Sequence, residues 1–310
     1  MFKILGFLLI FSVSMNNIFG QKVTYFNDND ENFAEVIVND DLIFTCRVAG
    51  LKNSGPYVIL LHGFPETSRM WKRLMKDLSK KNFRVIAPDQ RGYSKGARPK
   101  KVKDYSTYHL TNDVIEIANS FNIDKFHLVG HDWGAAVGWS ASKLFKNRLL
   151  SYSALSVPHI DAFSDAIKND KVQRKKSYYI ALFRLRLVPE LYFTFSNYRN
   201  LKSLWTSSSN DEIIDYMKVF SQKNAIKSAL NWYRATSLKK AQKLGNIEVP
   251  TLLIYGENDM AIGSKGIDET KKFISAEYKL KKIKSSHWLI QDSYDVVSQE
   301  ILNHFEKYNE

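Results

Sequence analysis

The fold is decided by the stretch Gly130-His131-Asp132-Trp133-Gly134 and by what stands on either side of it. Residues 126–129 before it form a short apolar run that is typical of a buried strand, and residues 135–145 after it have a helical pattern. Glycines on both sides suit a turn that is too tight for larger side chains. The pattern therefore predicts a nucleophile elbow, the strand-to-helix turn that presents its central side chain above a sheet.

The central residue of this turn is aspartate, where serine is the usual occupant. A carboxylate that attacks saturated carbon forms an alkyl ester, so ring opening or halide displacement is expected, and not ordinary ester hydrolysis. The alternative interpretation of Asp132 is a helix N-cap, a position that favours aspartate. A second match to G-x-S-x-G, at Gly92–Gly96, is followed by the loop-like residues 97–101 and not by a helix, so we reject it.

Strands and helices alternate along most of the chain. The further strands are expected at 35–50 (two strands around a turn at 39–41), 57–61, 83–88, 152–157, 250–255 and 278–284, and the helices at about 68–80, 107–121, 267–275 and 293–308. This alternation predicts an α/β fold with a mostly parallel, doubly wound sheet. From residue 158 to 245 the alternation stops and the pattern is helical. We therefore expect a core made of 21–157 and 246–310, with 158–245 inserted as a helical cap.

The first 20 residues have the features of a secretory signal peptide. Lys3 precedes a short apolar run at residues 4–15, and Gly20 offers a cleavage site that would leave Gln21 first. The run is shorter than the roughly 20 residues that span a bilayer, and no later segment is a transmembrane candidate. The protein is therefore expected to be secreted or periplasmic. The alternative is a membrane-associated protein that keeps its leader as an interfacial anchor.

Composition limits the remaining possibilities. The 310 residues are enough for one large α/β domain with an insertion. A single cysteine, Cys46, excludes an intramolecular disulfide, and no metal-site spacing is present, so no metal or cofactor is expected. The net charge of +13 comes from lysines scattered along the chain, with basic clusters at 100–103, 174–176 and 239–240 and no nucleic-acid-binding motif. We interpret it as a solvated basic surface, and nucleic acid is not an expected partner. Attraction to anionic surfaces or acidic substrates stays open as an alternative.

Two residues late in the chain could complete a catalytic relay with Asp132. Asp259 and His287 each follow a predicted strand, and ligands bind at the carboxyl ends of the strands in such sheets. A histidine base needs a carboxylate to orient it, and the order nucleophile, acid, histidine suits this fold. Glu257, in the same loop as Asp259, is the alternative acid.

The loop at 62–66, with the sequence HGFPE, follows a buried strand. In folds with a nucleophile elbow, the loop after this strand supplies one oxyanion-hole donor and the residue after the nucleophile supplies the other. The donors here would be the backbone N–H groups of Phe64 and Trp133. The alternative interpretation of the loop is a plain Gly-Pro turn. We interpret His62 and His131 as structural residues.

Taken together, HGFPE at 62–66, DQRGYS at 89–94, GHDWGA at 130–135, the late Asp259 and the late His287 resemble the epoxide hydrolase family of α/β-hydrolases. The resemblance covers nearly everything after the leader. The family opens epoxides to vicinal diols through an ester on the aspartate, without a cofactor, and holds the epoxide oxygen with two cap tyrosines. The resemblance implies these roles for Tyr233 and Tyr179. Tyr178 is adjacent to Tyr179, so the choice between these two tyrosines stays open. Either tyrosine could instead serve packing alone.

Two alternatives stay open. Haloalkane dehalogenases are similar and also carry Asp-Trp at the elbow. Their halide donors would be the indole of Trp133 together with a group in the position of Phe64 or a cap tryptophan such as Trp205. Fluoroacetate dehalogenases tend to carry arginine where this chain has Trp133. A binding protein without catalysis would typically have lost a relay residue, and none is missing. The epoxide, the selectivity and the oligomeric state do not follow from the sequence.

Overall fold

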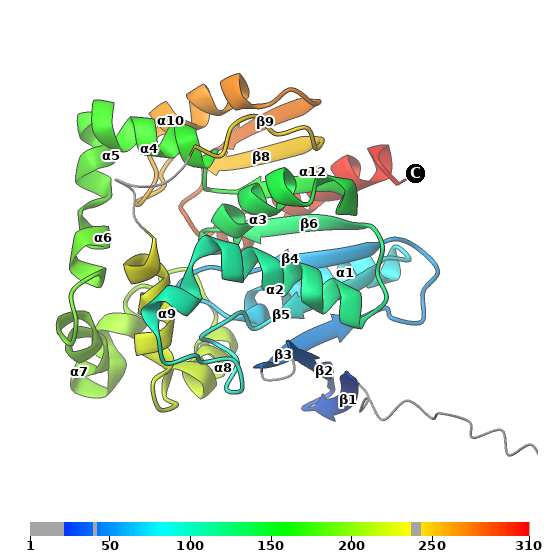
Figure 1. The fold of residues 1–310 in the computed structure, drawn as a ribbon, viewed down its shortest axis with the longest axis horizontal. Helices are drawn as coiled ribbons and strands as arrows, with labels where there is room; N and C mark the ends of the chain where they lie inside the picture. The colour runs from blue at the N-terminus through cyan, green and yellow to red at the C-terminus, as the bar shows by residue number, and fades with distance from the viewer. Residues whose placement is uncertain (1–21, 40–41, 237–242, 310) are drawn as a thin grey trace, which may run out of the picture.

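The computed structural model describes residues 22–39, 42–236 and 243–309. The predicted signal peptide and residues 40–41 of the first predicted turn lie outside these ranges. Within them, nine strands form one sheet in the order β1-β2-β3-β5-β4-β6-β7-β8-β9 (Figure 1). The strands are β1 (Val23–Asp28), β2 (Glu31–Val38), β3 (Leu42–Ala49), β4 (Tyr57–Leu61), β5 (Arg84–Pro88), β6 (Phe126–His131), β7 (Leu149–Leu155), β8 (Thr251–Gly256) and β9 (Tyr278–Ile283).

The sheet is mostly parallel, as expected. The strands from β5 through β4, β6, β7 and β8 to β9 pair in parallel, whereas β1, β2 and β3 pair antiparallel at one edge. Every residue of β6 is buried, which explains its nearly continuous apolar run. Figure 1 draws α2 (Thr107–Ser120) and α3 (Trp133–Leu144) in front of the sheet, with α1 (Lys72–Lys80) and α12 (Tyr294–Lys307) behind it. The α/β prediction is therefore confirmed.

The described residues between β7 and β8 hold helices and no strand. They are α4 (Ile160–Asn169), α5 (Lys171–Lys176), α6 (Tyr178–Phe183), α7 (Val188–Lys202), α8 (Asn210–Phe220) and α9 (Ala225–Ala235). In Figure 1 these helices lie toward the left of the sheet, the end to which the arrows of β6 and β8 point. The helices thus stand over the carboxyl ends of the strands. Their treatment as a separate cap stays a prediction.

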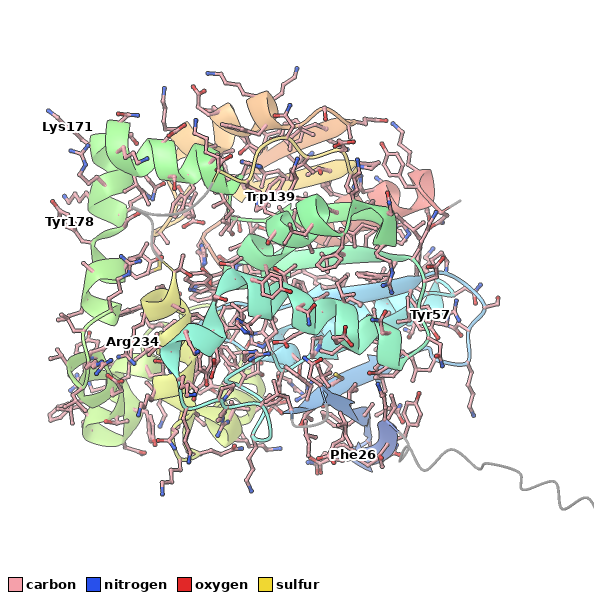
Figure 2. All side chains as sticks on the ribbon, viewed as in Figure 1. Phe26, Tyr57, Trp139, Lys171, Tyr178 and Arg234 are labelled. Carbon is pink, nitrogen blue, oxygen red and sulfur yellow. The ribbon has the colours of Figure 1, made fainter. Side chains whose placement is uncertain are left out.

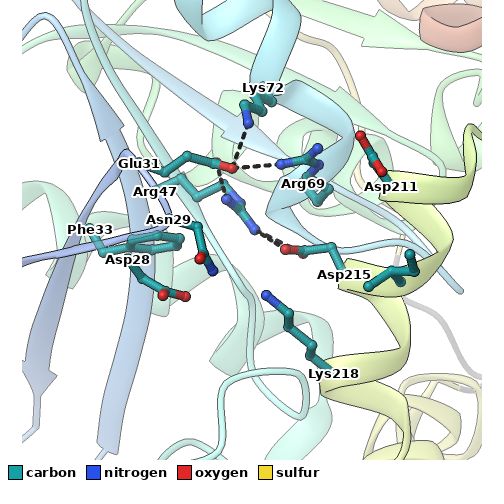
Figure 3. A pocket seen from close by; sticks show the side chains of 11 residues that line it. Asp28, Asn29, Glu31, Phe33, Arg47, Arg69, Lys72, Asp211, Asp215 and Lys218 are labelled. Carbon is teal, nitrogen blue, oxygen red and sulfur yellow. Dashed lines mark hydrogen bonds and ion pairs between the residues drawn. The ribbon is translucent and has the colours of Figure 1, made fainter.

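A cluster of ion pairs connects α8 to the antiparallel edge of the sheet (Figure 3). Arg47 of β3 binds Asp215 of α8 with an N···O distance of 2.7 Å and also binds Glu31. Glu31 in turn accepts from Arg69 at 2.6 Å and from Lys72 at 2.7 Å. Arg47 is buried, where an unpaired charge is costly, and it is neutralised by two carboxylates, one on α8 and one at the sheet edge. The cluster therefore fixes the position of α8 beside the sheet.

Several elements differ from the sequence-based expectation. Strand β2 begins at Glu31 and not at 35, and the helix expected at 68–80 is a 3₁₀ turn, Ser68–Trp71, followed by α1. Strand β1 was not predicted, because five of its six residues are exposed and no apolar alternation marks it. The helix expected at 267–275 is two short pieces, α10 (Ser264–Glu269) and the 3₁₀ turn Thr270–Phe273. Among the described residues, no helix combines the length and the apolar character needed to cross a membrane.

Candidate active site

Asp132 occupies a sharp turn between β6 and α3. Its φ of +51° and ψ of −120° are a backbone conformation that a non-glycine residue holds at a cost of about 1–3 kcal/mol. A Cβ atom on Gly130 would lie 2.3 Å from the carbonyl oxygen of Gly134, and one on Gly134 would lie 2.1 Å from that of Leu61. Only glycine fits at these two positions, which agrees with the elbow interpretation of the motif.

The carboxylate of Asp132 does not cap the helix that follows it. Its side chain makes no capping hydrogen bond to α3, and its Oδ1 accepts the backbone N–H of Phe64 at 2.8 Å. The side chain is therefore directed at the loop after β4. This contact argues against the N-cap interpretation and brings two of the predicted site residues together.

His287 stands between two carboxylates. Its Nδ1 lies 2.7 Å from Oδ2 of Asp259, and its Nε2 lies 3.6 Å from Oδ2 of Asp132. The other oxygen of Asp259 accepts the backbone N–H groups of Ala261 and Ile262 at 2.7 and 2.9 Å. The three relay residues predicted from the sequence thus meet at the ends of β6, β8 and β9. Glu257 is exposed, so the structure places Asp259 and not Glu257 beside the histidine.

The three charges at this site act on one another. Burial alone would lower the pKa of His287, but Asp259 and Asp132 together raise this pKa well above its ordinary value. Burial alone would raise the pKa of Asp132, but His287 and the N–H of Phe64 lower it. Asp132 is therefore an ionised carboxylate, which is the form that a nucleophile needs.

We expect the substitution Asp132→Asn to lower the pKa of His287. The charge of Asp132 favours the protonated imidazole, and asparagine removes that charge while keeping a similar shape. The histidine is cationic below its folded-state pKa. A lower pKa therefore means that the variant loses this charge at a lower pH than the wild type. The measurement is an NMR titration of the histidine ring protons, with the exposed Asp295→Asn as the control. An unchanged titration in Asp132→Asn would mean that the two side chains do not interact.

The two predicted oxyanion-hole donors both neighbour Asp132, one by contact and one in sequence. The N–H of Phe64 already binds the carboxylate of Asp132, and Trp133 is the first residue of α3. Preorganised N–H groups of this kind stabilise negative charge that develops on oxygen. The peptide bond between Phe64 and Pro65 is cis. The oxyanion role itself stays a prediction.

A cavity of about 520 Å³ opens in front of Asp132, and both predicted tyrosines line it. The rings of Tyr179 and Tyr233 lie 6.2 Å apart, centre to centre, while Tyr178 is 68% exposed and points away from the molecule (Figure 2). The structure therefore places Tyr179, and not its neighbour, at the cavity. The remaining walls are largely apolar, with residues such as Trp133, Val157, Ile160, Phe163, Ile180, Leu244 and Ile262.

Both phenols are held in the protonated form. Burial, followed by the charge of Asp132, raises the pKa of Tyr233 well above its ordinary value. The same two causes, with a smaller contribution from Asp259, raise the pKa of Tyr179. Protonated phenols can donate hydrogen bonds to an oxygen bound in the cavity. The pair therefore has the protonation state that a proton donor requires at neutral pH.

Glu66 is a site residue for which the sequence suggested no role. It is fully buried, its Oε2 lies 3.0 Å from Nδ1 of His131, and its Oε1 accepts from Gln291 at 2.7 Å. Nε2 of His131 donates to the backbone carbonyl of His287 at 2.9 Å. Glu66 and His131 thus support the segment that carries the relay histidine. Position 66 is visible in the HGFPE motif, but no local pattern shows what its carboxylate would contact.

Comparisons with known proteins agree with this geometry. The model of the alpha/beta hydrolase fold family matches residues 56–294. The AB hydrolase superfamily protein YfhM of Bacillus subtilis (strain 168) is 32% identical over 86% of this chain and 96% of its own length. Epoxide hydrolase 4 of Homo sapiens is 30% identical over 81% of this chain and 73% of its own length. A solved structure described among novel epoxide hydrolases in metagenomes from hot environments superposes with a TM-score of 0.79, at 25% identity, over 88% of this chain and 98% of that one.

The chain therefore belongs to the α/β-hydrolase fold family, and it is a homologue of proteins named epoxide hydrolases. The resemblance inferred from the motifs is confirmed at this level.

Proposed function

We propose that this protein hydrolyses epoxides to vicinal diols, with Asp132 as a nucleophile that forms a covalent ester. The observation that carries the proposal is the meeting of Asp132 with Tyr179 and Tyr233 at one largely apolar cavity. A carboxylate and two phenols are the groups that ring opening needs, because the nucleophile must be anionic and the departing oxygen needs a proton. Homologues named epoxide hydrolases support the substrate class.

In the first step one oxygen of Asp132 attacks a carbon of the epoxide ring and the bond from that carbon to the ring oxygen breaks. The electron pair of this bond stays on the ring oxygen, which takes a proton from Tyr179 or Tyr233. The product is a hydroxyalkyl ester of Asp132. The negative charge of Asp132 disappears in this step, and with it one of the causes that raise the pKa of both phenols. The tyrosines therefore become stronger acids as the alkoxide forms.

In the second step water attacks the carbonyl carbon of the ester. His287, oriented by Asp259, takes a proton from that water, and the N–H groups of Phe64 and Trp133 hold the oxyanion. Loss of the Asp132 charge also removes one cause of the raised pKa of His287, so its neutral, basic form becomes easier to reach. Collapse of the tetrahedral intermediate breaks the bond to the diol oxygen, which takes the proton held by His287. The carboxyl group of Asp132 that results gives up its proton and the tyrosinate left by the first step takes one, so the diol leaves and both side chains return to their starting forms.

Haloalkane dehalogenation is the second candidate, and the geometry favours it less. The indole N–H of Trp205, one of the two groups considered as a second halide donor, donates to the carbonyl oxygen of Pro65 at 2.9 Å. The other position holds Phe64, whose ring packs 5.8 Å from that of Tyr233, centre to centre, and has no donor. A non-catalytic binding protein is the third candidate. Asp132, Tyr179 and Tyr233 all line the cavity and all have shifted pKa values, which would be unusual for a purely apolar binding cavity.

The experiment that tests the proposal is a turnover assay of the purified protein with styrene oxide, fatty-acid epoxides and haloalkanes side by side. Diol formation from an epoxide, lost in Asp132→Asn, supports the proposal. Efficient halide release with no diol would favour the dehalogenase. No turnover of any of these substrates would favour a binding protein.

We further propose that residues 158–245 form a cap.

We also propose that the leader at 1–20 directs export. The leader lies outside the described residues, so its support is the short apolar run after Lys3. We expect N-terminal sequencing of the exported protein to begin at or near Gln21. Recovery of the mature protein with Met1 in place would contradict cleavage and favour the interfacial anchor.

A further inference from the structure

The outer surface of α5, α6 and α7 is unusually apolar for a surface in contact with water. We call it the cap face and define it as the exposed side chains of residues 171–202. Its side chains Tyr178, Leu187, Leu191 and Phe195 are between 68% and 71% exposed. Figure 1 shows the three helices along the left edge of the molecule, and Figure 2 shows Lys171 and Tyr178 pointing outward from that edge. A contiguous exposed apolar patch marks an interaction site.

The same segment is strongly basic. Residues 171–202 contain eight lysines and arginines and a single acidic residue, Glu190, so 32 residues carry +7 of the net charge of +13. Glu190 is paired with Arg234 at 2.8 Å, and Lys171, Lys175 and Arg186 are exposed. The basic charge of the protein is thus concentrated on the surface that also exposes large apolar side chains.

Left-handed backbone occurs at one of these apolar residues, Leu187, and directly after another, Phe195. Leu187 has a φ of +70°, and α7 is interrupted after Phe195, where residues 196–198 have φ between +48° and +62°. Left-handed backbone is costly for non-glycine residues and is often retained for function. No burial compensates it at Leu187, which is 71% exposed. The left-handed residues thus stand at both ends of the first part of α7, next to the exposed side chains of Leu187 and Phe195.

We propose that the cap face binds peripherally to an anionic lipid surface. Lysine and arginine near such a surface gain electrostatic attraction, and apolar side chains that protrude can enter the interface between headgroups and acyl chains. A second copy of the chain is a poorer occupant, because two faces with the same strong positive charge repel each other. The occupant that complements both the charge and the apolar side chains is a negatively charged bilayer.

The cap face lies next to the proposed active site. Helix α6 lines the catalytic cavity with Tyr179 and Ile180, while Tyr178 and Leu182 of the same helix are exposed. An open hollow of about 640 Å³, lined by Val172, Lys175, Lys176, Tyr179 and Met260, reaches Tyr179 from this side. If the proposed function holds, docking would turn this hollow toward the lipid, where apolar epoxides accumulate. The docking itself does not depend on that function.

The test is co-sedimentation of the full-length protein with vesicles of phosphatidylcholine alone and of phosphatidylcholine with phosphatidylglycerol. One variant carries Lys171→Glu, Lys175→Glu and Arg186→Glu on the cap face. Its matched control carries Lys76→Glu, Lys80→Glu and Lys81→Glu, which change the charge equally on the exposed surface near α1. A third variant replaces Leu187, Leu191 and Phe195 by serine. Circular dichroism verifies that all variants are folded.

We expect the wild type and the α1 control to bind anionic vesicles, and both cap-face variants to bind at least about tenfold more weakly. Binding should fall as salt is raised, because salt screens the attraction. Equal binding by all variants, or equal binding to neutral vesicles, would overturn the proposal and indicate attachment through the leader. No sedimentation of the wild type would overturn it as well. Light scattering on the same samples would identify a cap face that serves self-association instead.

Discussion

The substitution His287→Gln is expected to leave a stable ester on Asp132 after mixing with an epoxide. Attack by the carboxylate does not need a base, but attack by water on the ester does, and a general base typically accelerates such a step by about 10²- to 10⁴-fold. Glutamine keeps a hydrogen-bonding side chain in the position between Asp132 and Asp259 but cannot take the proton. Intact-mass spectrometry should show the protein heavier by one whole epoxide molecule, because ring opening expels no leaving group.

The control for this experiment is Asp132→Asn, which should give no adduct with the same epoxide. The size of the mass increase also separates the two candidate chemistries, since a haloalkane would add its alkyl group and lose the halide. Absence of an adduct in His287→Gln under saturating epoxide, in a folded protein whose wild type forms diol, would be incompatible with the two-step scheme.

The double substitution Tyr179→Phe with Tyr233→Phe is expected to slow alkylation of Asp132 by an epoxide by on the order of a hundredfold or more. Both phenols line the cavity, and their raised pKa values keep them protonated at neutral pH. An epoxide oxygen needs a proton when the ring opens, whereas a departing halide does not. Tyr233→Phe alone should show a smaller loss, because the second phenol can still donate.

The chain offers a matched control for the tyrosines. Tyr178 is adjacent to Tyr179 but is 68% exposed, so Tyr178→Phe should alkylate at the wild-type rate. Stability should be nearly unchanged in all of these variants, because phenylalanine retains the ring and its packing. Single-turnover measurement of ester formation provides the rates. Wild-type rates in the double variant would remove the tyrosines from the mechanism.

Most of the fold could be predicted because its strands and helices have recognisable local patterns of apolar and polar residues. Buried parallel strands such as β4 and β6 are short, nearly continuous apolar runs, and their order around the elbow defines the sheet. Strand β1 could not be predicted in this way, because it lies at the edge of the sheet and exposes most of its residues. Its pairing with β2 depends on the hairpin and not on burial.

The site residues also differ in how well the sequence predicts them. Asp132, Asp259 and His287 follow strands, so the sheet topology brings them together once their strands are placed side by side. The choices between Tyr178 and Tyr179, and between Glu257 and Asp259, depend on which side chain faces inward. For the two adjacent tyrosines, a one-residue change in register reverses the answer. The contact between Glu66 and His131 joins the loop after β4 to the last residue of β6, which are distant in sequence, and neither residue type signals it.

The central claim is that the nucleophile is Asp132 and not water, and a single turnover in water enriched in ¹⁸O tests it most directly. Excess enzyme is mixed with a limiting amount of an epoxide that it turns over, and both the diol and the peptide that contains Asp132 are analysed by mass spectrometry. We predict that the first diol carries only ordinary oxygen, because the attacking oxygen comes from Asp132, and that the label appears in the carboxylate of Asp132. Label in the diol of the first turnover, with an unlabelled Asp132, would contradict the account.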